Sequence, residues 1–413
     1  MHRRKLLQFL SAGATASLGA ACTTTPIATS SGGISLGIDE LAKAGFAPLK
    51  GRRVGFITNQ TSVNGAGEMS RIVLQQGLGS GLKALFGPEH GLDTRTRAGD
   101  HVANAVDGVT GLRAYSLYGE NRKPTPAMLA DIDILVFDIQ DIGVRSYTYI
   151  STMALAMEAC GQAGKDFIVL DRPNPLGGAM VQGPPMEEAL RSFVGQVPVP
   201  YRHGLTIGEL ARMIIAKGWI KANPKLTVIA MQGWQRAKPW AQTGLNWVPT
   251  SPNIPYSISP FYCATTGILG ELKDVDIGIG TGKPFQYAAA GGIDGAAFSA
   301  FTNGLALDGV RATPYISVAK PGFSGIELEI APTTQADLMT LAIILIQEIT
   351  RRSNGGALSG ATPSNLDLFK KVYGSEALAA SLQSGRPWQE LVADWQPSLA
   401  GFKRERVPFL LYR

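Results

Sequence analysis

Short runs of apolar, β-branched residues alternate with longer amphipathic stretches through the first half of the chain. Four such runs, at residues 53–58, 82–86, 134–138 and 167–171, predict buried strands. Between and after them the spacing of apolar residues predicts helices over 68–76, 148–163 and 206–217. Thr206 and Glu209 form a capping box at the start of the last helix. The alternation predicts an α/β fold with a doubly wound, mostly parallel sheet.

The pattern becomes less regular in the second half. A segment rich in Pro, Asn and aromatic residues covers 247–260 and is followed by a predicted strand at 325–330 and a predicted helix at 335–349. We therefore place a domain boundary near Ser251. This divides the chain into a larger α/β domain, residues 36–250, and a smaller α/β domain, residues 251–413.

The first 22 residues have the organisation of an export signal. Arg3-Arg-Lys5 precedes an apolar stretch that is too short to span a membrane, and small residues lead to Cys22. The paired arginines resemble a twin-arginine signal. The end resembles a lipoprotein cleavage site with Cys22 as the lipid-bearing residue, although cleavage by the general signal peptidase is the alternative. Residues 23–35 then form a flexible tether, and we expect an exported, periplasmic protein that contacts the membrane only through a lipid.

Composition narrows the class of protein. A hydrophobic content of 45% excludes disorder as the main state. The net charge is +6, and residues 3–5 carry three of these charges, so the mature chain keeps about +3. No block of Lys and Arg with interleaved aromatics is present, so we expect no nucleic-acid partner. Besides Cys22 the chain has only Cys160 and Cys263, which excludes a disulfide framework.

Polar or Gly/Pro-rich loops follow the carboxyl ends of the four predicted strands. They lie at residues 59–60, 87–91, 138–145 and 171–175. In an open α/β sheet, ligands bind at this edge. Four unusual loops would converge on one crevice there, and this is the main reason to expect an enzyme.

The loop Gly87-Pro-Glu-His-Gly91 places a carboxylate beside an imidazole. Cleavage of a glycosidic bond needs a carboxylic acid close to the leaving oxygen, and Glu89 is the natural choice for this general acid. The alternative is that Glu89 caps a backbone turn and His90 packs against it.

Three further segments carry candidate binding residues. Each segment also has a structural interpretation. The segment at 138–147 could hold an internal Asp–Arg pair with core tyrosines, and the segment at 171–174 could hold a structural ion pair. The histidine at 203 could be a buried one with its hydrogen bonds satisfied. The candidates are Asp138, Gln140, Asp141, Arg145 and Tyr147, then Asp171, Arg172 and Asn174, and finally His203.

These motifs, together with Arg202-His-Gly204, Thr243-Gly-Leu-Asn-Trp-Val-Pro249 and Ser251-Pro-Asn253, resemble those of the NamZ family of exo-β-N-acetylmuramidases. The resemblance implies a Rossmann-like first domain, a smaller second domain that closes the cleft, and no cofactor or metal. It implies release of N-acetylmuramic acid from the non-reducing ends of peptidoglycan fragments. By motif position Glu89 resembles the family's catalytic glutamate, and the other candidates in these motifs fall among its cleft-lining residues. We predict a catalytic group of Glu89, His90 and Asp138, with the other candidates, Asn253 and Glu271 binding the substrate.

The sequence departs from the family pattern after Glu271. Leu272-Lys-Asp274 replaces the usual Gly-Thr-Asn, and Ile279 stands where the family commonly has an arginine. This leaves the sugar preference open and motivates a second hypothesis, a catalytically weakened glycan-binding lipoprotein. A third, a metal-dependent hydrolase, is motivated by Glu89, His90, Asp138, Asp141 and His203.

Overall fold

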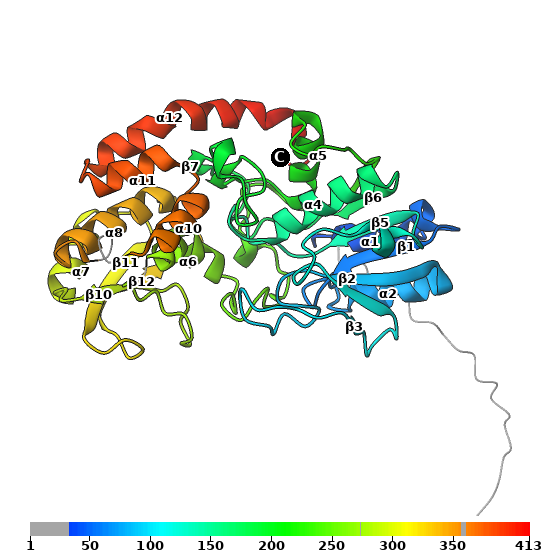
Figure 1. The fold of residues 1–413 in the computed structure, drawn as a ribbon, viewed down its shortest axis with the longest axis horizontal. Helices are drawn as coiled ribbons and strands as arrows, with labels where there is room; N and C mark the ends of the chain where they lie inside the picture. The colour runs from blue at the N-terminus through cyan, green and yellow to red at the C-terminus, as the bar shows by residue number, and fades with distance from the viewer. Residues whose placement is uncertain (1–32, 273, 357–360) are drawn as a thin grey trace, which may run out of the picture. The chain divides into compact units, whose positions relative to one another are not determined.

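The structure, a computed structural model, describes residues 33–272, 274–356 and 361–413 (Figure 1). The export signal, including Cys22, and most of the tether lie outside the described residues. Residues 33–413 form one compact unit. Within the described ranges, every helix is too short or too polar to cross a membrane. The domain boundary near Ser251 stays a prediction.

A seven-stranded sheet organises the first half of the chain. Its strands stand in the order β3-β4-β2-β1-β5-β6-β9, and only the edge strand β3 runs antiparallel to its neighbour. If the six parallel strands are counted along the chain from one to six, their order in the sheet is 3-2-1-4-5-6. This is the Rossmann order, so the predicted fold class is confirmed. The strands are β1 (Val54–Thr58), β2 (Leu82–Gly87), β3 (Ala105–Val106), β4 (Arg113–Ser116), β5 (Ile134–Asp138), β6 (Asp166–Leu170) and β9 (Leu226–Ile229).

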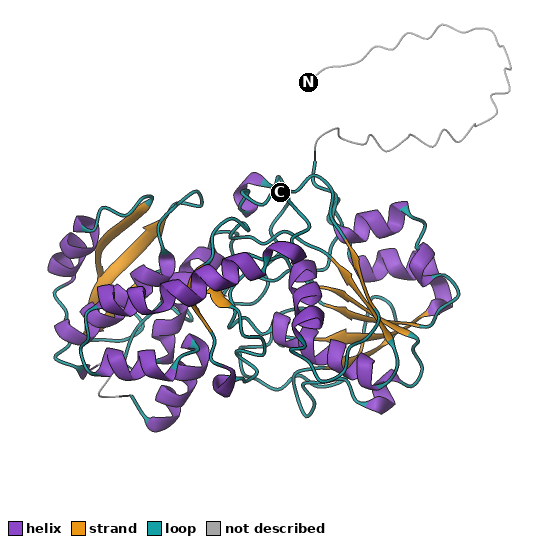
Figure 2. Cartoon of the chain, turned by 90° about the horizontal axis from the view of Figure 1, so that it is seen from above, coloured by secondary structure: helices purple, strands orange, loops and turns teal. Residues whose placement is uncertain are grey.

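Helices cover both faces of this sheet (Figure 2). Because side chains alternate along a strand, Phe56 of β1 packs with Leu41 and Leu74 on one face, whereas Ile57 packs with Met153 on the other. Each fully buried side chain of this size contributes roughly 1.5–3 kcal/mol to folding. The helices are α1 (Gly37–Lys43) and α2 (Ser70–Leu78) on the first face and α4 (Tyr149–Gln162) and α5 (Ile207–Lys217) on the second.

Two predicted helix starts have different outcomes. The capping box of α5 is present, since Thr206 accepts from the Glu209 amide and Glu209 accepts from the Thr206 amide. Thr148 stands at the N-cap of α4 but makes no side-chain capping bond. Its hydroxyl instead donates to the carboxyl group of Glu89.

The second half is built on a three-stranded antiparallel sheet in the order β10-β12-β11. A short antiparallel pair, β7 (Gln182–Pro185) and β8 (Pro200–Arg202), lies between β6 and β9 in the sequence. Helix α12 packs against β7 and α8 (Figure 1). The elements are β10 (Tyr287–Gly291), β11 (Val310–Ile316), β12 (Phe323–Ile330), α6 (Ser259–Thr266), α7 (Gly295–Gly304), α8 (Leu338–Arg352), α10 (Pro363–Tyr373), α11 (Glu376–Gln383) and α12 (Trp388–Glu405).

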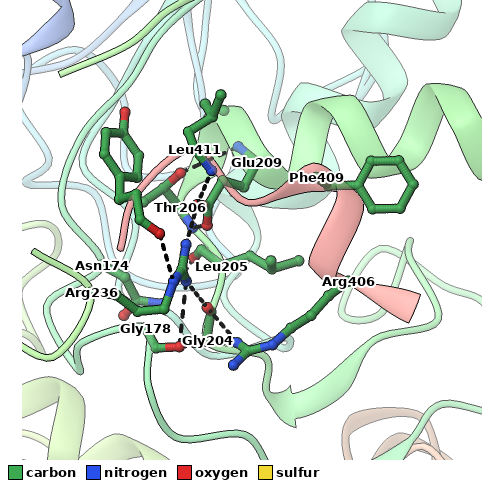
Figure 3. Close-up of polar contacts among 12 residues, drawn as sticks. Asn174, Gly178, Gly204, Leu205, Thr206, Glu209, Arg236, Arg406, Phe409 and Leu411 are labelled. Carbon is green, nitrogen blue, oxygen red and sulfur yellow. Dashed lines mark hydrogen bonds and ion pairs between the residues drawn. The ribbon is translucent and has the colours of Figure 1, made fainter. Parts of the chain in front are cut away.

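The last residues of the chain return to the first sheet. The Tyr412 hydroxyl donates to Asp171 at 2.6 Å, and the Arg413 carbonyl accepts from the Arg236 amide at 2.7 Å. Arg236 pairs with Glu209, which also accepts from the Leu411 amide (Figure 3). The C-terminal tail is therefore fixed where β6 and α5 meet.

Candidate active site

One cavity, of about 210 Å³, collects residues from both halves of the chain. We call it the two-glutamate cavity, because Glu89 and Glu271 both line it. The other lining residues are His90, Ala98, Ser146, Tyr147, Thr148, Val194, Tyr201, Ser251, Asn253, Ile254, Cys263, Gly267, Phe285 and Val372. Five of the predicted site residues thus meet here, namely Glu89, His90, Tyr147, Asn253 and Glu271.

Glu89 is held by hydrogen bonds on both carboxyl oxygens. Its Oε1 accepts from the Gly99 amide at 3.0 Å, and its Oε2 accepts from the Thr148 hydroxyl at 2.5 Å. Tyr118 lies beside this carboxyl group. Burial, together with the neighbouring Glu89, raises the pKa of Tyr118 to about 12. The loop after β2, the start of α4 and the residues that follow β4 therefore fix one carboxyl group at a defined place.

His90 is held in a strained backbone conformation. Its φ is 71°, in the left-handed region that few residues other than glycine adopt. Its Nδ1 lies 2.7 Å from the Thr96 carbonyl, which only accepts, so Nδ1 donates. Strain of this kind is typical of functional sites. Because Nδ1 is occupied, Nε2 is the ring nitrogen left to act in the cavity.

Glu271 differs from Glu89 in its surroundings. It ends the 3₁₀ helix Gly267–Glu271, and its backbone carbonyl accepts from the Asn365 side chain at 3.4 Å. No described residue bonds or pairs with its carboxyl group. Burial raises the pKa of Glu271 to about 7.

Tyr147 and Asn253 complete the polar part of the lining. The Tyr147 hydroxyl donates to Thr250 at 2.8 Å, and its ring packs edge-on against Tyr149 with centroids 4.8 Å apart. Asn253 makes no side-chain hydrogen bond within the described ranges, so its amide is left to act as donor and acceptor in the cavity.

Asp138 and Arg172 form a buried ion pair and do not line the two-glutamate cavity. Arg172 Nε and Nη2 donate to the two carboxylate oxygens at 2.5 and 2.9 Å. Both side chains are at most 3% exposed. Asp138 thus belongs to an internal Asp–Arg pair, as the structural interpretation of this segment holds, and its partner is Arg172 and not Arg145.

Arg145 is fully buried and is satisfied by backbone carbonyls. Its guanidinium donates to Pro184 at 3.0 Å, Val199 at 2.7 Å, Val372 at 3.0 Å and Tyr373 at 2.6 Å. These carbonyls belong to the β7–β8 hairpin region and to the end of α10. Arg145 thus ties the two halves of the chain together, and a role in substrate binding remains only a prediction.

The other predicted residues of the polar loops form a network behind the cavity. Gln140 donates to the carbonyls of Asp141 and Pro173, and Asn174 donates to Leu205. Asp171 accepts from four groups, including Tyr412. Burial raises the pKa of Asp141 to about 7 and that of Asp171 to about 6.

His203 lies in the same network and is buried. Its Nδ1 accepts from the Leu205 amide at 3.1 Å, and Nε2 has no partner among the described residues. Burial and then the charges of Arg406 and Arg145 lower the pKa of His203 to about 3. The folded protein therefore keeps this imidazole neutral at ordinary pH.

This burial gives a testable pH dependence. An unfolded histidine binds a proton below pH 6.5 and folded His203 does not, so its contribution disfavours folding increasingly as pH falls from about 6.5 to about 3. At pH 5 we expect this cost to be about 2 kcal/mol. Urea unfolding at pH 7 and pH 5 should show a smaller pH-linked loss in His203→Gln than in the wild type. The exposed His101→Gln should match the wild type, and equal losses in all three proteins would contradict the assignment.

Three groups that hold Glu89 were not predicted. Thr148 lies in the Tyr147-Thr-Tyr149 motif, but a threonine before a helix predicts a cap. Gly99 and Tyr118 carry no local signal, because their role depends on a contact between segments that are distant in the sequence.

No group of three or more His, Cys, Asp or Glu within residues 33–272, 274–356 and 361–413 could hold a metal ion. The five residues that motivate a metal-dependent hydrolase do not form one cluster. Cys160 and Cys263 are free and buried.

The fold and the site together define an α/β protein with two carboxyl groups in one cavity. Glycoside hydrolases use such a pair of carboxyl groups for catalysis. Family models for the N-terminal and C-terminal parts of exo-beta-N-acetylmuramidase NamZ match residues 54–257 and 261–412. The chain belongs to this family.

Known proteins of this kind are similar over most of their length. The peptidoglycan beta-N-acetylmuramidase NamZ of Bacillus subtilis is 37% identical over 389 residues, which is 92% of this chain and 91% of that protein. Two crystal structures of DUF1343 family proteins from Bacteroides fragilis each cover 92% of this chain and 99% of their own. They have TM-scores of 0.85 and 0.71 at 40% and 26% identity.

Proposed function

We propose that the protein is a glycoside hydrolase that releases N-acetylmuramic acid from the non-reducing ends of peptidoglycan fragments. The presence of Glu89 and Glu271 in one cavity carries this proposal. Glycosidic cleavage needs a carboxylic acid that protonates the leaving oxygen and a carboxylate on the other side of the sugar ring. The family and its characterised relative supply the substrate class.

The test is digestion of purified peptidoglycan fragments, with chromatography and mass spectrometry of the products. We expect free N-acetylmuramic acid to accumulate from the first minutes, while the shortened chains lose one sugar at a time. Release of longer oligosaccharides would instead show cleavage inside the chain. Absence of any product would overturn the proposal and favour the glycan-binding hypothesis.

Ile279, which stands where the family commonly has an arginine, is 46% exposed and does not line the two-glutamate cavity. The two carboxyl groups that the proposed reaction needs are present, and this favours a working hydrolase over a weakened glycan-binding protein.

We also propose that the protein is exported, on the basis of Arg3, Arg4 and the small residues before Cys22. Lipid on Cys22 would hold it at the membrane, close to newly released wall fragments. Growth with a labelled fatty acid should label the wild type but not Cys22→Ala. An unlabelled wild type that still accumulates outside the cytoplasm would show export without an anchor.

A further inference from the structure

The two carboxyl groups of the cavity have opposite surroundings. Glu89 accepts from the Gly99 amide and the Thr148 hydroxyl, with the Tyr118 hydroxyl as a third neighbour. Two donors, one on each oxygen, fit a carboxylate, which only accepts. Hydrogen bonds donated to both oxygens favour the charged form of a carboxyl group.

Glu271 has the surroundings of an uncharged acid. It is largely buried, and no donor or cation from the described residues reaches its carboxyl group. Desolvation disfavours the charged form of such a group, and burial raises the pKa of Glu271 to about 7. The described lining contains no Lys or Arg that would hold the carboxyl group in its charged form.

The cavity lining contains few other titratable groups that could act as the proton donor. They are His90 from the loop after β2, Tyr147 before α4, Tyr201 of β8 and Cys263 of α6. Burial raises the pKa of Cys263 to about 12 and the pKa values of both tyrosines above their usual range. Tyr201 and Cys263 line the same cavity as Glu271.

We infer that Glu271 is the general acid of this site and that Glu89 is its charged partner on the other side of the scissile bond. The inference rests on the proposed function and assigns the roles within it. Sequence analysis predicted the proton donor to be Glu89, because the loop at residues 87–91 supplies a carboxylic acid after a predicted strand. The contacts of the two side chains favour the reverse assignment.

The reaction then balances with one proton on the carboxyl pair. As the bond between C1 and the glycosidic oxygen breaks, its electron pair stays on the oxygen, which takes the proton of Glu271. Water supplies the hydroxyl group that becomes bound to C1. The remaining proton of that water returns to the pair, so Glu271 is again protonated and Glu89 again charged.

The inference predicts a dependence on the leaving group. Glu271→Gln should lower kcat/KM on a peptidoglycan disaccharide by about 100- to 10,000-fold. The loss should be much smaller on a nitrophenyl glycoside of N-acetylmuramic acid, whose leaving group departs without a proton. Glu89→Gln should lose activity on both substrates. The decline of wild-type activity above about pH 7 should be absent from Glu271→Gln.

Controls separate this inference from the proposed function. The exposed Glu329→Gln, in the same half of the chain, should match the wild type on both substrates, and unchanged melting temperatures should show that all variants fold. If Glu271→Gln misfolds, Glu271→Asp, which keeps the acid but shortens its reach, should still decline above about pH 7. Two results with an active wild type would overturn the inference but not the proposed function. The first is an equal loss of activity on both substrates in Glu271→Gln. The second is a loss that depends on the leaving group in Glu89→Gln and not in Glu271→Gln. A wild type that cleaves neither substrate would overturn the proposed function as well.

Discussion

Replacing Glu89 with Gln is expected to lower kcat/KM on peptidoglycan fragments by about 100- to 10,000-fold without unfolding the protein. The amide keeps the shape of the side chain. Its oxygen can still accept from the Gly99 amide, while its NH₂ group can donate to the Thr148 hydroxyl, which rotates to accept. The charge is lost and the hydrogen bonds are kept, so the effect should fall on turnover.

Steady-state kinetics and thermal melting of Glu89→Gln and Glu329→Gln measure this difference. Glu329 is exposed, so its variant controls for the loss of one negative charge. Near-normal turnover of Glu89→Gln on natural glycan would remove Glu89 from the reaction. A large fall in melting temperature would show that its hydrogen bonds serve the fold instead.

Replacing Arg145 with Met is expected to be the most destabilising of these changes. It would leave four buried carbonyl groups without a donor, and each unsatisfied group costs about 1–3 kcal/mol. Partial relaxation should leave a loss on the order of 5 kcal/mol, a large part of the free energy of unfolding of a typical protein. Sequence analysis gave Arg145 as a candidate binding residue, whereas these four contacts give its guanidinium a role in holding the fold together.

Urea unfolding of Arg145→Met and of Arg95→Met gives the comparison. Arg95 is 86% exposed, so its variant should unfold at the wild-type urea concentration. If Arg145→Met kept wild-type stability and lost substrate affinity, the guanidinium would be a binding group after all.

The sequence predicted four of the seven strands of the first sheet, those that are buried on both faces, and missed β3, β4 and β9, which are short and partly exposed. Such strands appear as continuous apolar runs, and the four predicted ones begin or end within one residue of the observed limits. It also placed the polar loops at the carboxyl edge. The helices shifted by up to three residues. Helix α8 begins at Leu338 and not at Gln335, because the carboxyl group of Asp337 caps its first turn.

The sequence could not separate the residues of the cavity from those behind it. Asp138 and Arg172 are 34 residues apart, and only the parallel pairing of β5 with β6 brings them together. A guanidinium that binds carbonyl groups, as Arg145 does, has the same local sequence as one that binds a substrate. The contrast between Glu89 and Glu271 likewise depends on partners supplied by distant segments.

The return of residues 411–412 to the first sheet has a consequence for cooperativity. Asp171 and Glu209 belong to the first half of the chain, yet each accepts a hydrogen bond from a residue more than 200 positions further on. The first half by itself therefore leaves two buried carboxyl groups with an incomplete set of partners, and each missing partner costs about 1–3 kcal/mol. We expect the two halves to unfold together in one transition, because the stability of the first sheet depends on residues that the second half delivers to it.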